Sequence, residues 1–317
     1  MKRIALLCGA LALAGTAAAQ TYPGNRPIKL VVPFSAGGNA DLTARLIAKQ
    51  LAGGLKTPVI VENRAGANGT VGLDAVRQAA PDGHTLLVTT SSVAAIGPVQ
   101  GTNFNPATEL DGVALLAKAP LIVLTPPSSP IRSIQDLVRM DRERPRTLNF
   151  ATSGPGSTTH IATELFNLRA GTTLQHIPYR GTAGALTDLV AGRVDLMFTT
   201  IASAAGQLRG GLLRIIAYTS DDRPEGVPPA PSVKSTGIDY EFGIWWGLFA
   251  PRGLPPQVRQ SLNEATNAAL SDPGFARYLT GEGAIPSPMS ADAFTDFLRA
   301  EVMTMREVVA AAKIRAN

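Results

Sequence analysis

The chain has 317 residues, of which 45% are hydrophobic, 17% are charged and only one is a cysteine. This length exceeds one typical hydrophobic core, so it predicts two lobes. The net charge of +5 falls to +3 without residues 1–19, which hold Lys2 and Arg3, and the remaining basic residues are interspersed with acidic ones. This pattern excludes a phosphate-binding tract, and no nucleic-acid partner is expected.

The first 19 residues have the pattern of a signal peptide. Lys2 and Arg3 precede an apolar run at 4–14, and three alanines at 17–19 form a small-residue cleavage site before Gln20. The run is too short for a permanent membrane anchor. Cys8 lies inside it, and a lipid-attachment site there would leave almost no apolar run. We therefore predict export to the periplasm with cleavage near Ala19.

The first strand, turn and helix form a candidate anion site. An apolar run at 30–32 ends at Pro33, a small-residue loop follows, and a helical pattern opens at Asp41. Gly37 and Gly38 allow positive φ angles and close approach of a ligand to the backbone. The free amides and the dipole at the start of a helix attract anions, although a plain strand-to-helix turn has the same pattern.

Strand and helix patterns then alternate, which favours an α/β protein with mainly parallel sheets. Further strands are predicted at 58–63, 84–91, 115–125, 148–151, 194–200 and 213–218, and an apolar, aromatic run at 242–250 leads into Pro251. Helices are predicted to begin at Ser133 and to end before Gly192, with three more at 255–270, 272–280 and 291–312. We expect the last helix to pack on a lobe through an apolar stripe that contains Phe294, Leu298, Val302, Met305 and Val309.

A second loop of small residues, 152–160, repeats the first motif about 115 residues later. Two such sites, one in each lobe, could face each other across a cleft. The helix after this loop is predicted to bury Ile161, Leu165, Phe166 and Leu168 on one side. His160 lies in its first turn, where donation to loop carbonyls is favoured over a role as a general base.

Motifs for catalysis are missing. The sequence has no GxGxxG, Walker, HExxH or GxSxG pattern, and without residues 1–19 it has three histidines and no cysteine. No catalytic residue, metal or cofactor is therefore expected.

Several motifs together resemble the tripartite tricarboxylate transporter substrate-binding proteins, the Bug or TctC family. The matching segments are VVPFSAGG at 31–38, VENR at 61–64, PDG at 81–83, NFA at 149–151, PYRGT at 178–182, DLMF at 195–198 and WWGLFAP at 245–251. The resemblance implies a type II periplasmic binding protein with two α/β lobes and a cleft between them. It implies one discontinuous lobe, 24–124 with 246–317, and a second lobe, 125–245.

The resemblance also implies a function and a site. It suggests a monomeric receptor, not an enzyme and not embedded in the membrane, which binds a small carboxylate and delivers it to a membrane permease. The expected ligand-binding residues are Ser35, Ala36, Gly37, Gly38, Asp41, Thr90, Ser91, Thr152, Ser153, Ser157, Thr158, Tyr179 and Thr199. Amides and hydroxyls, rather than Arg180, are predicted to hold the carboxylate. Thr199 stands where the family often has an acid, which disfavours a ligand with an ammonium group.

Two other functions remain open at this point. A sensory protein that binds the same ligand and docks on a signalling partner would have the same sequence features. An enzyme that uses hydroxyls and His160 on a small acid is a weaker alternative, because the motifs for catalysis are missing.

Overall fold

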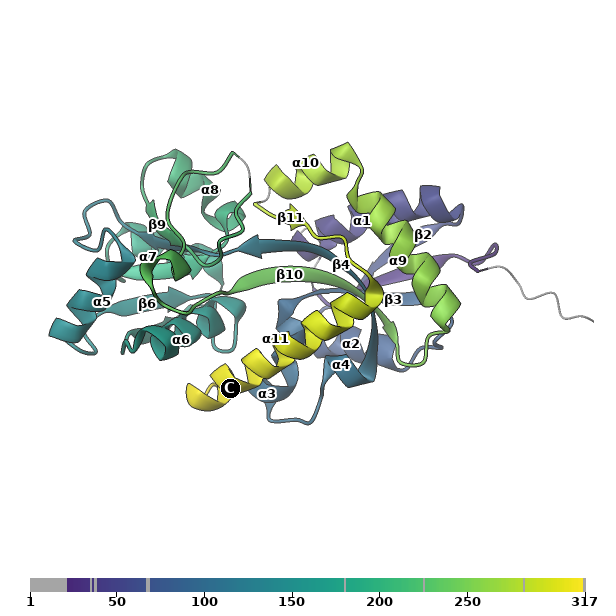
Figure 1. The fold of residues 1–317 in the computed structure, drawn as a ribbon, viewed down its shortest axis with the longest axis horizontal. Helices are drawn as coiled ribbons and strands as arrows, with labels where there is room; N and C mark the ends of the chain where they lie inside the picture. Colours follow the sequence, from purple (N-terminus) through teal and green to yellow (C-terminus); the bar gives the residue numbers. More distant parts are fainter. Residues whose placement is uncertain are drawn as a thin grey trace, which may run out of the picture.

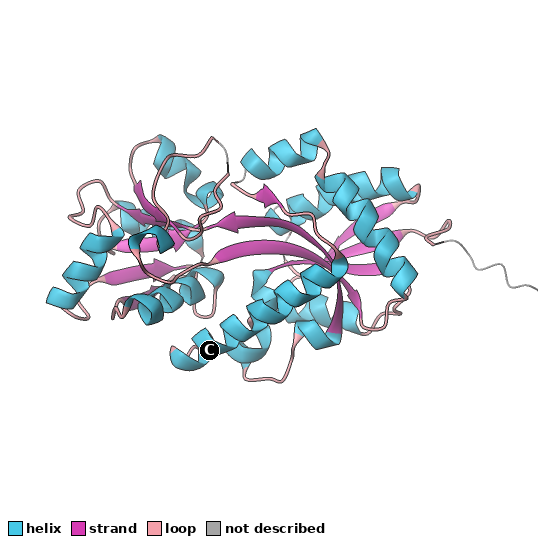
Figure 2. Ribbon diagram, viewed as in Figure 1, coloured by secondary structure: helices cyan, strands magenta, loops and turns pink. Residues whose placement is uncertain are grey.

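Two β-sheets lie side by side, each flanked by helices, in the computed structural model (Figures 1 and 2). The structure describes residues 22–34, 36, 39–66, 69–179, 181–224, 226–281 and 283–315. The predicted signal peptide lies outside these residues. None of the helices in the described part of the chain combines the length and apolar character needed to cross a membrane.

The larger sheet has six strands in the order β11-β4-β10-β3-β1-β2. These strands are β1 (Ile28–Val32), β2 (Val59–Asn63), β3 (Thr85–Thr90), β4 (Leu110–Pro120), β10 (Gly243–Pro251) and β11 (Ile285–Pro286). Strands β2, β1 and β3 are parallel, whereas β10 runs antiparallel to both β3 and β4. The carboxyl ends of the three parallel strands therefore open onto one edge of the sheet, where ligands commonly bind.

The smaller sheet has five strands in the order β7-β6-β8-β5-β9. These strands are β5 (Ile122–Thr125), β6 (Asn149–Thr152), β7 (Gln175–Pro178), β8 (Leu196–Thr199) and β9 (Arg214–Tyr218). Strands β7, β6 and β8 are parallel, and β5 runs antiparallel to β8 and β9. Both sheets thus have a parallel core to which antiparallel strands are added, which confirms the predicted α/β class.

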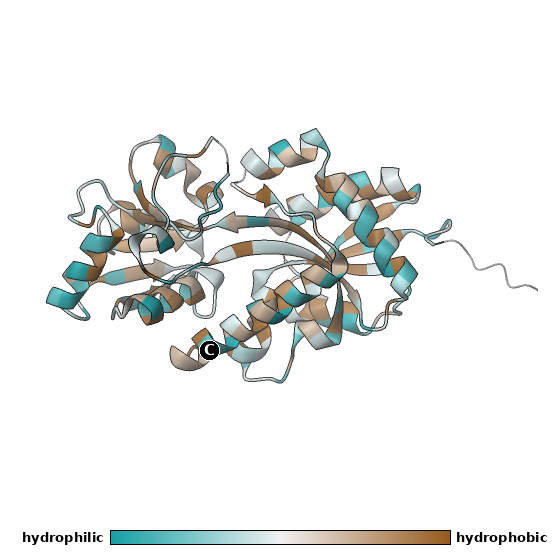
Figure 3. Cartoon of the chain, in the orientation of Figure 1, coloured by the Kyte–Doolittle hydropathy of each residue, from teal (hydrophilic) through white to brown (hydrophobic). Residues whose placement is uncertain are grey.

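Helices cover both faces of each sheet (Figure 2). They are α1 (Asn39–Leu55), α2 (Thr70–Arg77), α3 (Ile96–Gln100), α4 (Pro106–Glu109), α5 (Ile134–Glu143), α6 (Thr158–Ala170), α7 (Thr182–Val190), α8 (Ile201–Arg209), α9 (Pro256–Leu270), α10 (Pro273–Gly281) and α11 (Ala291–Ala311), with short 3₁₀ turns η2 (Ser91–Ala94) and η3 (Lys234–Thr236). Hydrophobic residues gather on the strands and on the inner sides of the helices (Figure 3). Ser133 caps α5 and Gly192 follows α7 with φ of 70°, so both predicted helix ends are confirmed.

Two crossings connect the sheets. The sequence predicts one strand at 115–125, but the structure has two, because the chain leaves the larger sheet after β4 and enters the smaller one at β5. Leu121 lies at this break, and its amide donates to the Thr219 hydroxyl oxygen at 2.7 Å. The Thr219 carbonyl accepts from the Phe242 amide at 2.9 Å, next to β10. One buried threonine therefore joins both crossings.

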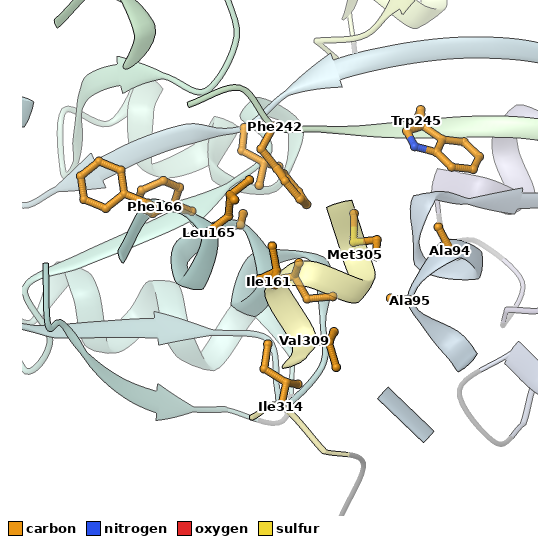
Figure 4. Packing of buried hydrophobic residues seen from close by; sticks show 14 of the residues in the cluster. Ala94, Ala95, Ile161, Leu165, Phe166, Phe242, Trp245, Met305, Val309 and Ile314 are labelled. Atoms are coloured by element: carbon orange, nitrogen blue, oxygen red, sulfur yellow. The ribbon is translucent and has the colours of Figure 1, made fainter. Parts of the chain in front are cut away.

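One hydrophobic cluster extends through both sheets. Helix α11 contributes all five residues of its predicted apolar stripe, which is confirmed as buried. Met305, Val309 and the following Ile314 lie beside Ile161 and Leu165 of α6 (Figure 4). Leu168 of α6 was also predicted to face inward, but 43% of its surface is exposed, so this prediction is wrong. The buried face of α6 continues from Leu165 and Phe166 to Ala170, and Leu168 lies on the exposed side of the helix.

Candidate functional site

A cavity of about 590 Å³ lies between the two sheets. The loops that follow β1, β2 and β3 form one wall, and the loop between β6 and α6, with a residue after β7, forms the other. The described lining residues are Pro33, Phe34, Ala65, Gly66, Gly69, Ser92, Ala95, Ile96, Val99, Gln100, Ser153, Gly154, Pro155, Gly156, Ser157 and Tyr179. The volume is in the range of small-molecule sites.

The loop between β6 and α6 is held together by its own hydrogen bonds. The amides of Ser153 and Gly154 donate to the hydroxyls of Thr159 and Thr152 at 3.1 and 3.2 Å. The Gly156 amide donates to His160 Nδ1 at 3.1 Å, and the Ser157 amide donates to the Gly154 carbonyl at 3.2 Å. Pro155 has no N–H. Four amides of this loop, including those of the predicted residues Ser153 and Ser157, are thus engaged within the loop, which leaves hydroxyls as its main polar groups on the cavity.

The hydroxyls of this loop form a linked set at the start of α6. Ser157 caps the helix, since its Oγ accepts from the His160 amide at 3.3 Å. Thr159 Oγ1 lies 3.2 Å from Ser153 Oγ and 3.0 Å from Ser157 Oγ. Thr159 orients both cavity hydroxyls, and sequence reasoning missed it. Its signal was available, because it is the third of three consecutive hydroxyl residues at a predicted helix start.

Two stacked histidines support the loop from behind. The rings of His160 and His176 are 3.8 Å apart and inclined by 15°, and His176 Nε2 lies 2.7 Å from Thr152 Oγ1. Burial, and then the nearby His160, lower the pKa of His176 to about 4, against a small opposing effect of Glu164. His160 was expected to donate to loop carbonyls; instead its Nδ1 accepts from the Gly156 amide, because the loop turns that N–H toward the ring.

Tyr179 adds a phenol to the same wall. Its hydroxyl donates to Asp188 Oδ2 at 2.7 Å, and Asp188 also accepts from Arg193. Desolvation and this hydrogen bond raise the pKa of Tyr179 to about 12. The side chain is therefore a neutral phenol fixed in one orientation.

Asp41 anchors the opposite wall. This residue is 2% exposed, and its carboxylate accepts from Asn63 Nδ2 at 2.9 Å and pairs with Arg45. Asn63 Nδ2 also donates to the Phe34 carbonyl at 3.2 Å. Asp41 thus ties the start of α1 and the loop after β1 to the end of β2. It is absent from the described lining, so its support for the cavity is indirect.

The structure brings only part of the predicted site together. Ser153, Ser157 and Tyr179 line the cavity, whereas Ser35, Gly37, Gly38 and Arg180 lie outside the described residues. Besides Asp41, six predicted residues are described but do not line it: Ala36, Thr90, Ser91, Thr152, Thr158 and Thr199. Thr152 and Thr199 are buried in strands, and Thr90 contacts the cavity residue Ser92 through their hydroxyls at 2.9 Å.

The sequence does not predict the apolar wall of the cavity, which comes from the larger sheet. Ala95, Ile96 and Val99 follow β3 in a short helical segment, and Phe34 precedes the first small-residue loop. In the sequence such residues cannot be distinguished from ordinary core. Gly156 faces this wall closely, since a Cβ there would lie 2.8 Å from Val99 Cγ1. Its φ of 69° and this contact bring the two walls together at one point.

Comparison with known proteins identifies the family. Residues 43–314 match the tripartite tricarboxylate transporter family receptor profile, TctC. The chain is 34% identical over 306 residues to protein BugT of Bordetella pertussis, covering 94% of each chain.

Solved structures agree with this assignment. R. palustris Rpa4515 with adipate is 31% identical, with a TM-score of 0.77, over 93% of this chain and all of that one. MatC from Rhodopseudomonas palustris with bound malate is 32% identical, with a TM-score of 0.73, over 90% of this chain and 99% of that one. This protein belongs to the TctC family of tripartite tricarboxylate transporter receptors, a family of periplasmic substrate-binding proteins and not of enzymes.

Proposed function

We propose that this receptor captures a small carboxylate in the cavity between its two sheets. The Ser153 hydroxyl carries the proposal, because it lies near the start of α6 and can donate to an anion where the helix dipole also favours one. The Ser157 hydroxyl donates its proton to the Gly154 carbonyl at 2.7 Å, so it holds the loop in place. The adipate and malate bound by two related proteins are small carboxylates, which supports the same class of ligand here.

A thermal-shift screen of small mono- and dicarboxylates tests this proposal. A ligand that binds only the folded state stabilises it by about 2.7 kcal/mol at a hundredfold excess over Kd. We expect Ser153→Ala to reduce the shift, while Ser271→Ala, at an exposed position outside the cavity lining, should leave it unchanged. NMR of the best ligand over hours should show no consumption. Turnover, or no hit in the screen, would refute the proposal.

We further propose that two lobes close on the ligand. One lobe would comprise 24–124 and 246–317 and the other 125–245, a division supported by the change of sheet between β4 and β5 and before β10. Thr219, which joins both crossings, would lie on the hinge. Small-angle scattering should give a smaller radius of gyration with saturating ligand, and identical curves would mean a rigid, preformed cavity.

The family's place in the periplasm predicts how the chain reaches it and what it meets there. We propose that residues 1–19 are removed on export and that the mature chain, a monomer, delivers its ligand to the permease subunits of a tripartite tricarboxylate transporter. Intact mass from periplasmic extract should begin near Gln20. Pull-down of the permease with ligand-loaded receptor should exceed that with ligand-free receptor, and retrieval of a signalling protein instead would favour sensing.

A further inference from the structure

The two walls of the cavity differ in chemical character. The wall from the smaller sheet presents the hydroxyls of Ser153, Ser157 and Tyr179. The wall from the larger sheet is mainly apolar, and its apolar side chains are Pro33, Phe34, Ala65, Ala95, Ile96 and Val99. The hydroxyls of Ser157 and Tyr179 donate to Gly154 and Asp188, so Ser153 is the hydroxyl of this wall with a proton left for a ligand. A ligand between the walls meets polar oxygen atoms on one side and, apart from Ser92 and Gln100, hydrocarbon on the other.

The apolar wall is backed by the hydrophobic core. Ala95 and Val99 are 3% and 8% exposed, and both belong to the cluster that also contains Met305 and Ile161 (Figure 4). Ile96 is partly buried and packs against the same cluster. Residues 95, 96 and 99 lie on one side of a helical segment, so together they form a firm surface rather than mobile side chains.

The described lining residues include no acidic or basic side chain. An ammonium group on the ligand would lose water without gaining a carboxylate partner among them, which is costly in a partly enclosed site. A carboxylate can instead accept from the Ser153 hydroxyl near the start of α6. The described lining therefore selects against a zwitterionic ligand, and its apolar wall favours a hydrocarbon group.

We propose that the ligand is a carboxylate with a hydrocarbon body, an aliphatic chain or an aromatic ring, whose carboxylate contacts the hydroxyl wall and whose body lies against Phe34, Ile96 and Val99. The proposal rests on the proposed function and deepens it, since it specifies the part of the ligand that is not the carboxylate. A second charge is not needed for binding.

Calorimetric titration of linear acids tests this division. Burying one methylene strengthens binding about fourfold, so hexanoate should bind about 16-fold more tightly than butyrate. Hexanoate should also bind at least as tightly as adipate, and 6-aminohexanoate should bind about tenfold more weakly than hexanoate or worse. The heat-capacity change should be more negative for hexanoate than for butyrate, because more apolar surface is buried.

A pair of variants locates the hydrocarbon body. Ile96→Ala should weaken hexanoate about tenfold while butyrate changes less, because the longer chain loses apolar contact. Leu168→Ala, at an exposed leucine outside the cavity lining, should change neither. If adipate binds tenfold more tightly than hexanoate, or Ile96→Ala leaves the chain-length gain intact, this inference is overturned while the proposed function stands. If no carboxylate binds, both are overturned.

Discussion

The pH dependence of stability should reveal His176. Its pKa in the folded protein is about 4, against an ordinary value of 6.5. In the unfolded chain His176 therefore binds a proton near pH 6.5, whereas in the folded protein it binds that proton only near pH 4. Stability contributed by neutral His176 is complete above pH 6.5 and is lost as the pH falls through this window.

The size of the effect follows from the difference between the two pKa values. Each pKa unit corresponds to about 1.4 kcal/mol, so a fully buried His176 would lower the free energy of unfolding by about 3.4 kcal/mol once the pH is below 4. His176 is partly exposed, and solvent screening reduces this figure by about half. Between pH 7.5 and pH 5, where only part of the transition is complete, we expect a loss of about 1 kcal/mol.

Urea unfolding followed by circular dichroism measures this loss. The free energy of unfolding of wild type minus that of His176→Gln should fall by about 1 kcal/mol from pH 7.5 to pH 5. The variant removes the titrating ring, so titrating groups that do not interact with His176 cancel in the difference. A difference that is the same at both pH values, with equal m-values, would refute the argument that burial against His160 keeps His176 neutral.

Three further substitutions test other parts of the structure. Gly156→Ala and Gly171→Ala both place a side chain at positive φ, at 69° and 65°, so each should lower the free energy of unfolding by about 1 kcal/mol. Only Gly156→Ala places a methyl group against the opposite cavity wall, so only this variant should weaken hexanoate binding at least tenfold in calorimetric titration. Trp245→Phe removes the 2.8 Å hydrogen bond to Glu301 and should lower the free energy of unfolding in urea by about 1–3 kcal/mol. Burial raises the pKa of Glu301, so the loss should be larger at pH 7, where the carboxylate is charged, than at pH 4; equal losses at both pH values would contradict this. Asp41→Ala should cost about 1–3 kcal/mol and weaken hexanoate, and unchanged unfolding would show that the anchor is dispensable.

Periodicity in the sequence predicts most elements of the fold but not where one strand ends. Residues 110–112 include Asp111 and Gly112, which are uncommon in strands, yet they pair with 249–251 and extend β4. The same strand stops at Leu121 because the chain changes sheets there, which is a tertiary event with no local signal. Pairing between distant segments therefore decides these boundaries.

The polar half of the candidate site is more predictable than the apolar half. Small hydroxyl residues at a helix start carry a local signature, which placed Ser153 and Ser157 at the cavity. The loop's internal hydrogen bonds depend on its folded path, so sequence reasoning counted amides that are already engaged. Ile96 and Val99 resemble core residues, and only the folded arrangement shows that one side of them faces a cavity.

The cluster shared through α11 has a consequence for how the molecule unfolds. Met305 and Val309 pack with residues of both sheets, so neither sheet can lose its structure without exposing apolar surface that belongs to the other. We expect heat to unfold the whole protein in one transition, with calorimetric and van't Hoff enthalpies that agree. Two resolved transitions would mean that the sheets unfold independently despite this shared cluster.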